Sequence, residues 1–305
     1  MNTQILQNDF WKLEVLPRLG ASPTALKAFV ENAWQPVIRP TARALLVGES
    51  SANFSSYNLA PYSNRIKNNK FVFEGREYKL RPNWTDGIMT IHGDIRNRPL
   101  EMTRTENALE FFFDSRTVTD SNYPFDYSFK TNYALEGDVL VSHLEVQNVG
   151  DARMPAGLGY HPYFVPHFLG SSAAPRLHFQ ASSVYLTDTS RIPEGASQAI
   201  PNELDFSSPA SATETFIDNI YNDWDGVATL EWVGSGYRLK IEGDKIYSHF
   251  VVFNGDPDGT IALEPVSHAT DGFNLLARGV PNTGVKILEP GEILSGAMRL
   301  KLEQV

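Results

Sequence analysis

Hydrophobic residues in this chain recur with a period of two far more often than with the 3.6-residue period of an amphipathic helix. In residues 138–148, Leu140, Leu144 and Val146 share one face, which predicts a strand buried on that face. Residues 229–244 predict a β-hairpin, because two alternating segments flank a Gly-Ser-Gly turn. No long stretch at helical spacing competes with these patterns. They favour an all-β fold.

The C-terminal third predicts further strands. Residues 249–253 and 260–263 are short apolar runs separated by turn residues, and they predict two adjacent buried strands. Residues 284–292 and 297–302 predict two more strands around a Pro-Gly turn. No Pro/Gly/Ser-rich linker and no fixed-period repeat divides the chain. We therefore expect one large antiparallel β domain over residues 1–305.

Composition narrows the classes of function. The net charge of −10 argues against nucleic acid or an anionic membrane as the main partner. The absence of cysteine excludes disulfides, thiolate catalysis and cysteine-based metal sites. Residues 1–10 have neither the cationic start nor the apolar core of a signal peptide, and no run of eighteen apolar residues occurs. We expect a cytoplasmic protein, either a monomer or a homodimer.

Glu264 is the least ordinary residue in the chain. It follows three apolar residues and directly precedes Pro265. A carboxylate at the end of a buried strand is unusual, because removing its charge from water is costly. Pro265 lacks a backbone donor, so we expect the strand to end there at an exposed edge. This placement makes Glu264 a candidate for acid–base chemistry.

His161 lies in Gly-Tyr-His-Pro-Tyr-Phe, residues 159–164, where Pro162 restricts its backbone. A partly buried histidine can titrate near neutral pH, although most buried histidines are structural. Aromatic residues around these motifs, among them Tyr163, could line a cleft for a ring-shaped polar ligand. A carboxylate and an imidazole that face each other could supply a general base and a general acid.

Residues 91–98 contain His92 followed by Gly93, which indicates a tight turn or a close approach of two backbone segments. Arg96 and Arg98 follow. They could be solvated, pair with acidic residues or bind an anionic substrate. Arg65 and Asp218 are weaker candidates, because a surface arginine and a turn carboxylate are common structural features. No zinc or calcium ligand spacing is present, so we expect no metal site.

The ordered set of motifs resembles the aldose 1-epimerase (mutarotase) family, with similar order and spacing from about residue 44 to residue 292. The set comprises Asn-Arg-Ile at 64–66, Ile-His-Gly at 91–93, the 159–164 motif, Ile-Asp-Asn at 217–219, Leu-Glu-Pro at 263–265 and Asp-Gly-Phe-Asn at 271–274. Where many members have Asn-His-Thr-Tyr-Phe, this chain has Gly-Tyr-His-Pro-Tyr-Phe. It is similar to a divergent, bacterial-type branch of the family.

The resemblance implies a galactose-mutarotase-like β-supersandwich of stacked antiparallel sheets. It also implies an isomerase that interconverts sugar anomers without a cofactor. Glu264 would remove the proton of the anomeric hydroxyl and His161 would protonate the ring oxygen, with His92 as a third catalytic residue. Arg65, Asp218 and Tyr163 would bind the sugar.

Two other functions are compatible with the same motifs. The first is epimerisation of a hexose 6-phosphate, in which Arg96 and Arg98 would contact the anion. The second is a carbohydrate-binding protein that uses this fold without turnover. The presence of both Glu264 and His161 favours an enzyme, because a protein that only binds sugar needs no acid–base pair.

Overall fold

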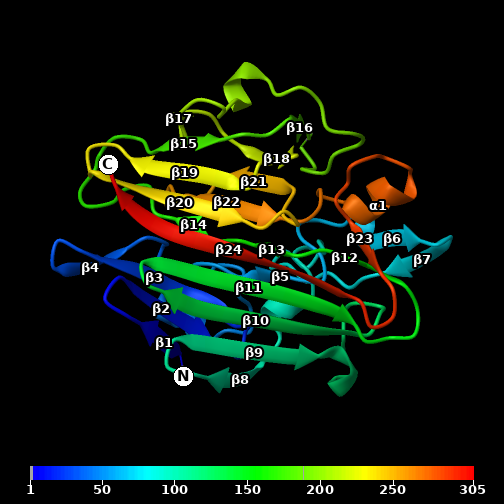
Figure 1. The fold of residues 1–305 in the computed structure, drawn as a ribbon. Coiled ribbons are helices and arrows are strands. Elements are labelled where there is room, and N and C mark those ends of the chain that lie inside the picture. Colours follow the sequence, from blue (N-terminus) through cyan, green and yellow to red (C-terminus); the bar gives the residue numbers. More distant parts are fainter. Residues whose placement is uncertain (1–2, 188) are drawn as a thin grey trace.

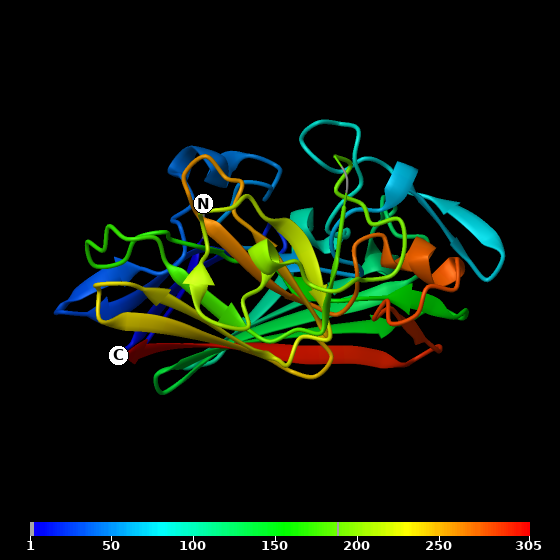
Figure 2. The same ribbon diagram turned by 90° about the horizontal axis from the view of Figure 1, so that it is seen from above.

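Antiparallel sheets make up almost all of the regular structure in the computed structural model of the chain (Figure 1). The structure describes residues 3–187 and 189–305, so Met1 and Asn2 of the N-terminal segment considered above lie outside it. The sheets stack as expected for a supersandwich. Figure 2 shows this stacking from above, with the red strand β24 (Ile293–Gln304) in one layer and the orange strand β22 (Ile261–Val266) in another.

The largest sheet has nine described strands and forms one face of the molecule. In spatial order they are β17 (Ala210–Ser211), β15 (Arg176–Phe179), β19 (Val227–Trp232), β20 (Tyr237–Gly243), β24, β11 (Val139–Asn148), β10 (Tyr127–Glu136), β9 (Ala108–Asp114) and β8 (Glu101–Arg104).

The second sheet has seven described strands and carries most of the candidate chemistry. Its order is β16 (Ser183–Tyr185), β18 (Asp218–Asn222), β21 (His249–Phe253), β22, β13 (Gly159–Tyr160) and β5 (Asn58–Leu59). The seventh strand, β14 (Tyr163–Phe164), pairs with β22 beyond the end of β13.

Smaller elements complete the structure. A four-stranded sheet contains β1 (Gln4–Gln7), β2 (Trp11–Leu16), β3 (Ser22–Val30) and β4 (Ala33–Pro36), and two strand pairs join β6 (Lys70–Phe73) to β7 (Arg76–Lys79) and β12 (Met154–Ala156) to β23 (Lys286–Leu288). The α-helix α1 (Gly272–Ala277) is short, and 3-10 turns occur at Arg43–Val47, Lys67–Asn69, Ile95–Asn97, Ser115–Thr117 and Asn202–Leu204. Among the described residues no helix has the length and apolarity to cross a membrane.

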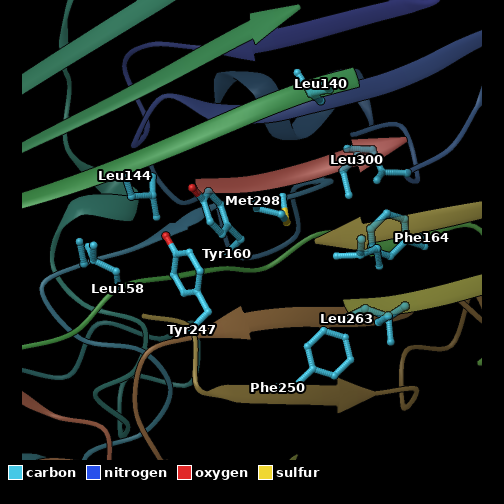
Figure 3. Close-up of a cluster of buried hydrophobic side chains, with 14 of the residues drawn as sticks. Leu140, Leu144, Leu158, Tyr160, Phe164, Tyr247, Phe250, Leu263, Met298 and Leu300 are labelled. Carbon is cyan, nitrogen blue, oxygen red and sulfur yellow. The ribbon is translucent and has the colours of Figure 1, made fainter. Parts of the chain in front are cut away.

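The hydrophobic core lies between the nine-stranded and seven-stranded sheets. In Figure 3, Leu140 and Leu144 from β11 and Met298 from β24 lie on one side, and Phe250 from β21 and Leu263 from β22 lie on the other. All five side chains are buried, because removing apolar surface from water is favourable. One contiguous cluster of buried hydrophobic residues extends from Leu6 to Leu300.

Several of the predicted strands are confirmed. The strand predicted within residues 138–148 is β11, with Leu140, Leu144 and Val146 buried on one face. The predicted hairpin is β19 and β20, and the two apolar runs become the neighbouring strands β21 and β22. The two C-terminal strands are β23 and β24, which pair with different partners and not with each other.

The expectation that Pro265 ends a strand at an exposed edge is wrong. Pro265 lies inside β22, which has β21 on one side and β13 and β14 on the other. Leu263 and Ser267 donate their backbone N–H groups to the β13/β14 side, and alternation along a strand turns the Pro265 nitrogen the same way. There it meets the break between β13 and β14, where a missing donor costs no ladder hydrogen bond.

Gly93 permits the close backbone approach that its sequence context indicates. It has a φ of +73° and forms a bridge with Ala60. A Cβ atom at residue 93 would lie 2.0 Å from the carbonyl oxygen of Ala60. This contact brings the loop that carries His92 against the loop that leads to Arg65, and it requires a residue without a side chain.

We predict that Gly93→Ala destabilises the fold more than Gly75→Ala does. Gly75 has a similar φ of +78° but nothing within 4 Å of a Cβ atom, so its substitution costs about 1–2 kcal/mol for the backbone alone. At Gly93 the steric clash adds about 1–3 kcal/mol. Chemical denaturation of both variants measures the difference, and equal losses of stability would contradict the role of the contact.

Candidate active site

Six residues singled out from the sequence line one pocket beside inner strands of the seven-stranded sheet. The cavity measures about 140 Å³, below the roughly 300–1,000 Å³ of sites for drug-sized ligands, and suits a small ligand. Side chains from β18, β21 and β22 meet loops around residues 57, 64 and 84–92 there. Its polar and aromatic lining includes Glu264, His161, His92, Arg65, Asp218, Tyr163, Tyr57, Trp84 and Asp256.

Glu264 and His161 are in direct contact at the base of this pocket. Glu264 projects from β22, and His161 lies in the break between β13 and β14. The distance from His161 Nε2 to Glu264 Oε1 is 3.1 Å. Glu264 is 2% exposed and His161 5%, and among the described residues neither Glu264 Oε2 nor His161 Nδ1 has a hydrogen-bond partner. Buried polar atoms in this state are unusual, and a bound polar ligand would satisfy them.

Burial favours the neutral forms of both side chains. It raises the pKa of Glu264 well above its ordinary value, and the negative charge of Asp218 acts in the same direction while Arg65 opposes it. Burial lowers the pKa of His161 well below its ordinary value, with Arg39 as the next cause. Both shifts act against a charged pair, so a proton that the two side chains share is favoured on Glu264 over His161.

His92 is held as a neutral hydrogen-bond donor. The backbone N–H of Asn64 donates to His92 Nδ1 at 3.2 Å, so the ring carries its proton on Nε2. Burial lowers the pKa of His92 well below its ordinary value, followed by the effect of His161. The two imidazole rings lie 4.9 Å apart and nearly perpendicular. This arrangement presents a fixed N–H group beside the Glu264–His161 pair.

Asp218 and Arg65 form a second polar centre in the pocket. One carboxylate oxygen of Asp218 lies 3.7 Å from Arg65 Nη2 and 3.6 Å from Nε of Arg191, a half-exposed residue. The Arg65 Nε is buried and has no hydrogen-bond partner in the part of the chain that the structure describes. An aspartate between two arginines remains an acceptor for hydroxyl groups, while the unpartnered N–H of Arg65 is a donor.

The Asp-Gly-Phe-Asn motif fixes the position of Arg65. The backbone N–H of Asp271 donates to the Arg65 carbonyl at 2.9 Å, and its carboxylate accepts from the Lys67 N–H and from Asn274. Asp271 is buried and has a φ of +56°. Its role is to support the Arg65 loop, because its side chain points to this network and does not line the pocket.

Two arginines considered for anion contact lie outside the pocket lining. Arg98 pairs with Asp94 at 2.9 Å and Asp120 at 2.6 Å, which gives it a structural role instead. Arg96 is fully buried, with its guanidinium 4.9 Å from the centre of the Trp84 ring. Its Nε and Nη1 have no hydrogen-bond partner among the described residues.

Sequence reasoning missed Tyr57 and Asp256. Tyr57 is fully buried with its ring 4.6 Å from that of His161, and Asp256 lines the pocket from the segment after β21. Tyr57 lies among small polar residues with no distinctive pattern. Asp256 lies in a turn-rich segment, where an aspartate is ordinary.

Comparisons with known proteins agree on one family. The sequence model of the family described as aldose 1-epimerase matches residues 15–301. The uncharacterized protein YphB of Escherichia coli (strain K12) is 28% identical over 90% of this chain and 92% of its own length.

Solved structures show the same fold. A galactose mutarotase-like protein from Clostridium acetobutylicum has a TM-score of 0.85 at 23% identity, over 99% of this chain and 95% of its own. The galactose 1-epimerase from Lactobacillus acidophilus NCFM has a TM-score of 0.75 at 16% identity, over 98% of this chain and 93% of its own.

We predict that Glu264→Gln makes the protein more stable than the wild type, increasingly so as pH rises. A raised pKa means that Glu264 contributes stability that is complete below 4.5 and is lost as pH rises toward its folded-state pKa. The glutamine variant lacks this loss. The free energy of unfolding of Glu264→Gln minus that of the wild type should therefore grow by up to about 1.4 kcal/mol per pH unit between pH 4.5 and the folded-state pKa of Glu264.

Chemical denaturation at several pH values between 5 and 8 measures this difference. Glu106→Gln, on an exposed residue, controls for the removal of a surface carboxylate. A difference between Glu264→Gln and wild type that is independent of pH would show that Glu264 ionises normally in the folded protein.

Proposed function

This chain belongs to the aldose 1-epimerase family, and we propose that it catalyses the interconversion of the α and β anomers of a monosaccharide. The observation that carries the proposal is the buried contact between Glu264 and His161, which opens onto a small polar pocket. Anomer exchange requires one proton to leave the anomeric hydroxyl and another to reach the ring oxygen. Two side chains that hold one proton between them can supply both the proton donor and the proton acceptor.

The reaction proceeds as follows in this proposal. The bound sugar separates Glu264 from His161, and the shared proton moves to His161. Glu264 then takes the proton of the anomeric hydroxyl while His161 donates to the ring oxygen, so the C1–O5 bond breaks and an aldehyde forms. Rotation about C1–C2 and the reverse transfers close the ring as the other anomer. Each cycle restores the protons, and no oxidation change occurs.

The other polar residues of the pocket suit the binding of the sugar. His92 Nε2–H is positioned to donate to an oxygen next to the reacting centre, because its tautomer is fixed by Asn64. Asp218 and Arg65 provide an acceptor and a donor for ring hydroxyls. Preorganised groups of this kind stabilise charge that develops in the transition state.

The charge balance of the pocket favours a neutral monosaccharide over a hexose 6-phosphate. Arg65 faces Asp218, Arg39 is paired with Asp256, and Arg98 is paired with aspartates away from the pocket. Arg96 has no carboxylate partner within the described part of the chain, but it is fully buried and does not line the pocket. A phosphate-binding site would instead present arginines free of carboxylates. A phosphorylated sugar is the second candidate, and it would require Asp218 to turn away from Arg65.

We predict that Glu264→Gln and His161→Asn each lower the rate of anomer exchange by about 10²–10⁴-fold, because each removes one proton-transfer group. Exchange NMR on a panel of free sugars and their 6-phosphates measures the rate. Glu106→Gln serves as the control and should retain the wild-type rate. Wild-type rates in either site variant would reject the assignment, and no acceleration of any sugar by the wild type would indicate a binding protein.

We predict that kcat/KM has no inflection near pH 6.5, the ordinary pKa of histidine. The lowered pKa of His161 means that a second proton is added only well below 6.5, and the raised pKa of Glu264 means that the single proton is lost only well above 4.5. A Glu–His pair with ordinary pKa values would lose its proton, and with it the activity, above pH 6.5. Polarimetry corrected for spontaneous mutarotation gives the profile, and an inflection near 6.5 would contradict the neutral pair.

A further inference from the structure

We propose that Arg39 is a positioning residue for His161 and acts through the ring of Tyr163. Three planar groups lie in series. The guanidinium carbon of Arg39 is 3.9 Å from the centre of the Tyr163 ring, and that ring stacks on the imidazole of His161 at 4.7 Å with 27° between the planes. The other end of the series is the His161–Glu264 contact.

Arg39 itself is firmly held. Its Nη1 donates to the carboxylate of Asp256, to Asp258 at 3.2 Å and to the Thr260 hydroxyl at 3.4 Å, and its Nη2 donates to the Phe54 carbonyl at 3.4 Å. Four acceptors fix the plane of a guanidinium far better than one ion pair does. Thr260 immediately precedes β22, so the same contacts tie Arg39 to the strand that carries Glu264.

The position of Arg39 separates support from substrate contact. Tyr163 and Asp256 line the pocket, and Arg39 lies behind them. Its guanidinium lies over the Tyr163 ring, an attractive arrangement in a partly dry environment. Arg39 therefore holds the Tyr163 ring in place against His161, and its positive charge acts on His161 as well. The positive charge of Arg39 is the largest cause after burial of the lowered pKa of His161.

Other groups around His161 must be considered with Arg39. Besides Tyr163, those in contact or acting on its charge are Glu264, His92, Tyr57, Arg65 and Arg96. Arg65 and Arg96 also favour neutral His161, but both act after Arg39 in magnitude. Glu264 and the two rings are needed for the proposed chemistry or for packing. Substitution of Arg39 therefore changes the surroundings of His161 without removing a side chain that lines the pocket.

The test compares Arg39→Met, Arg39→Lys and a control, Arg299→Met. Arg299 also pairs with an aspartate, Asp244, but lies in β24 on the nine-stranded sheet and away from the pocket. Two quantities are measured in each protein: the titration of the His161 ring by NMR, and kcat and KM for anomer exchange. The kinetic part rests on the proposed function, and the titration part does not.

Arg39→Met should raise the pKa of His161 and lower kcat by about 10–100-fold with KM nearly unchanged, since a small misplacement of a reacting group costs that much. Arg39→Lys should keep the charge but not the flat stacking, so its His161 titration should stay near that of the wild type while kcat falls. Arg299→Met should match the wild type in both.

Three results would overturn the proposal: an unchanged His161 titration in Arg39→Met, a rise in KM alone, or full kcat in Arg39→Lys. If Arg39→Met does not fold, Arg39→Lys still decides through its kcat. If the wild type exchanges no anomers, the proposed function fails, and a shifted His161 titration in Arg39→Met still supports the contact through Tyr163.

Discussion

The burial of one carboxyl group in the middle of a sheet is the constraint on which the candidate site depends. Glu264 is 2% exposed, and its Oε1 lies 3.1 Å from His161 Nε2. A charged carboxylate there would be expensive, so the group stays protonated or finds a counter-charge. The break between β13 and β14 makes the contact geometrically possible, because it leaves His161 free of the ladder beside β22.

The segment that follows Glu264 holds the rest of the pocket in place. The Ser267 N–H bonds to Leu158, His268 accepts from the Ser63 N–H at 3.0 Å, and Asp271 bonds to Arg65. The proposed base and the loop with Arg65 are thereby fixed to the same stretch of chain. Gly93 then brings His92 against the other end of that loop. Short, rigid connections of this kind preorganise a site for charge development.

The sequence predicted what local patterns encode and missed what distant segments decide. Strands with one buried face, such as β11, can be predicted from the alternation of apolar and polar residues. Glu264 can be identified because it follows three apolar residues and precedes a proline. Pro265 was misjudged because its tolerance depends on a break in a strand a hundred residues earlier. Arg98 lies close to His92 in sequence, but the turn at Ile95–Asn97 directs it to Asp94 and Asp120. Tyr57 and Arg39 carry no local signal.

The central claim is that Glu264 and His161 share one proton, held on Glu264 when the pocket is empty. Infrared difference spectroscopy between the wild type and Glu264→Gln at pH 7 observes this directly, because protonated and ionised carboxyl groups absorb at different frequencies. The account predicts a protonated-carboxyl band in the wild type that is missing from the variant. A carboxylate band in its place would mean that Glu264 is ionised in the empty pocket and would contradict the account.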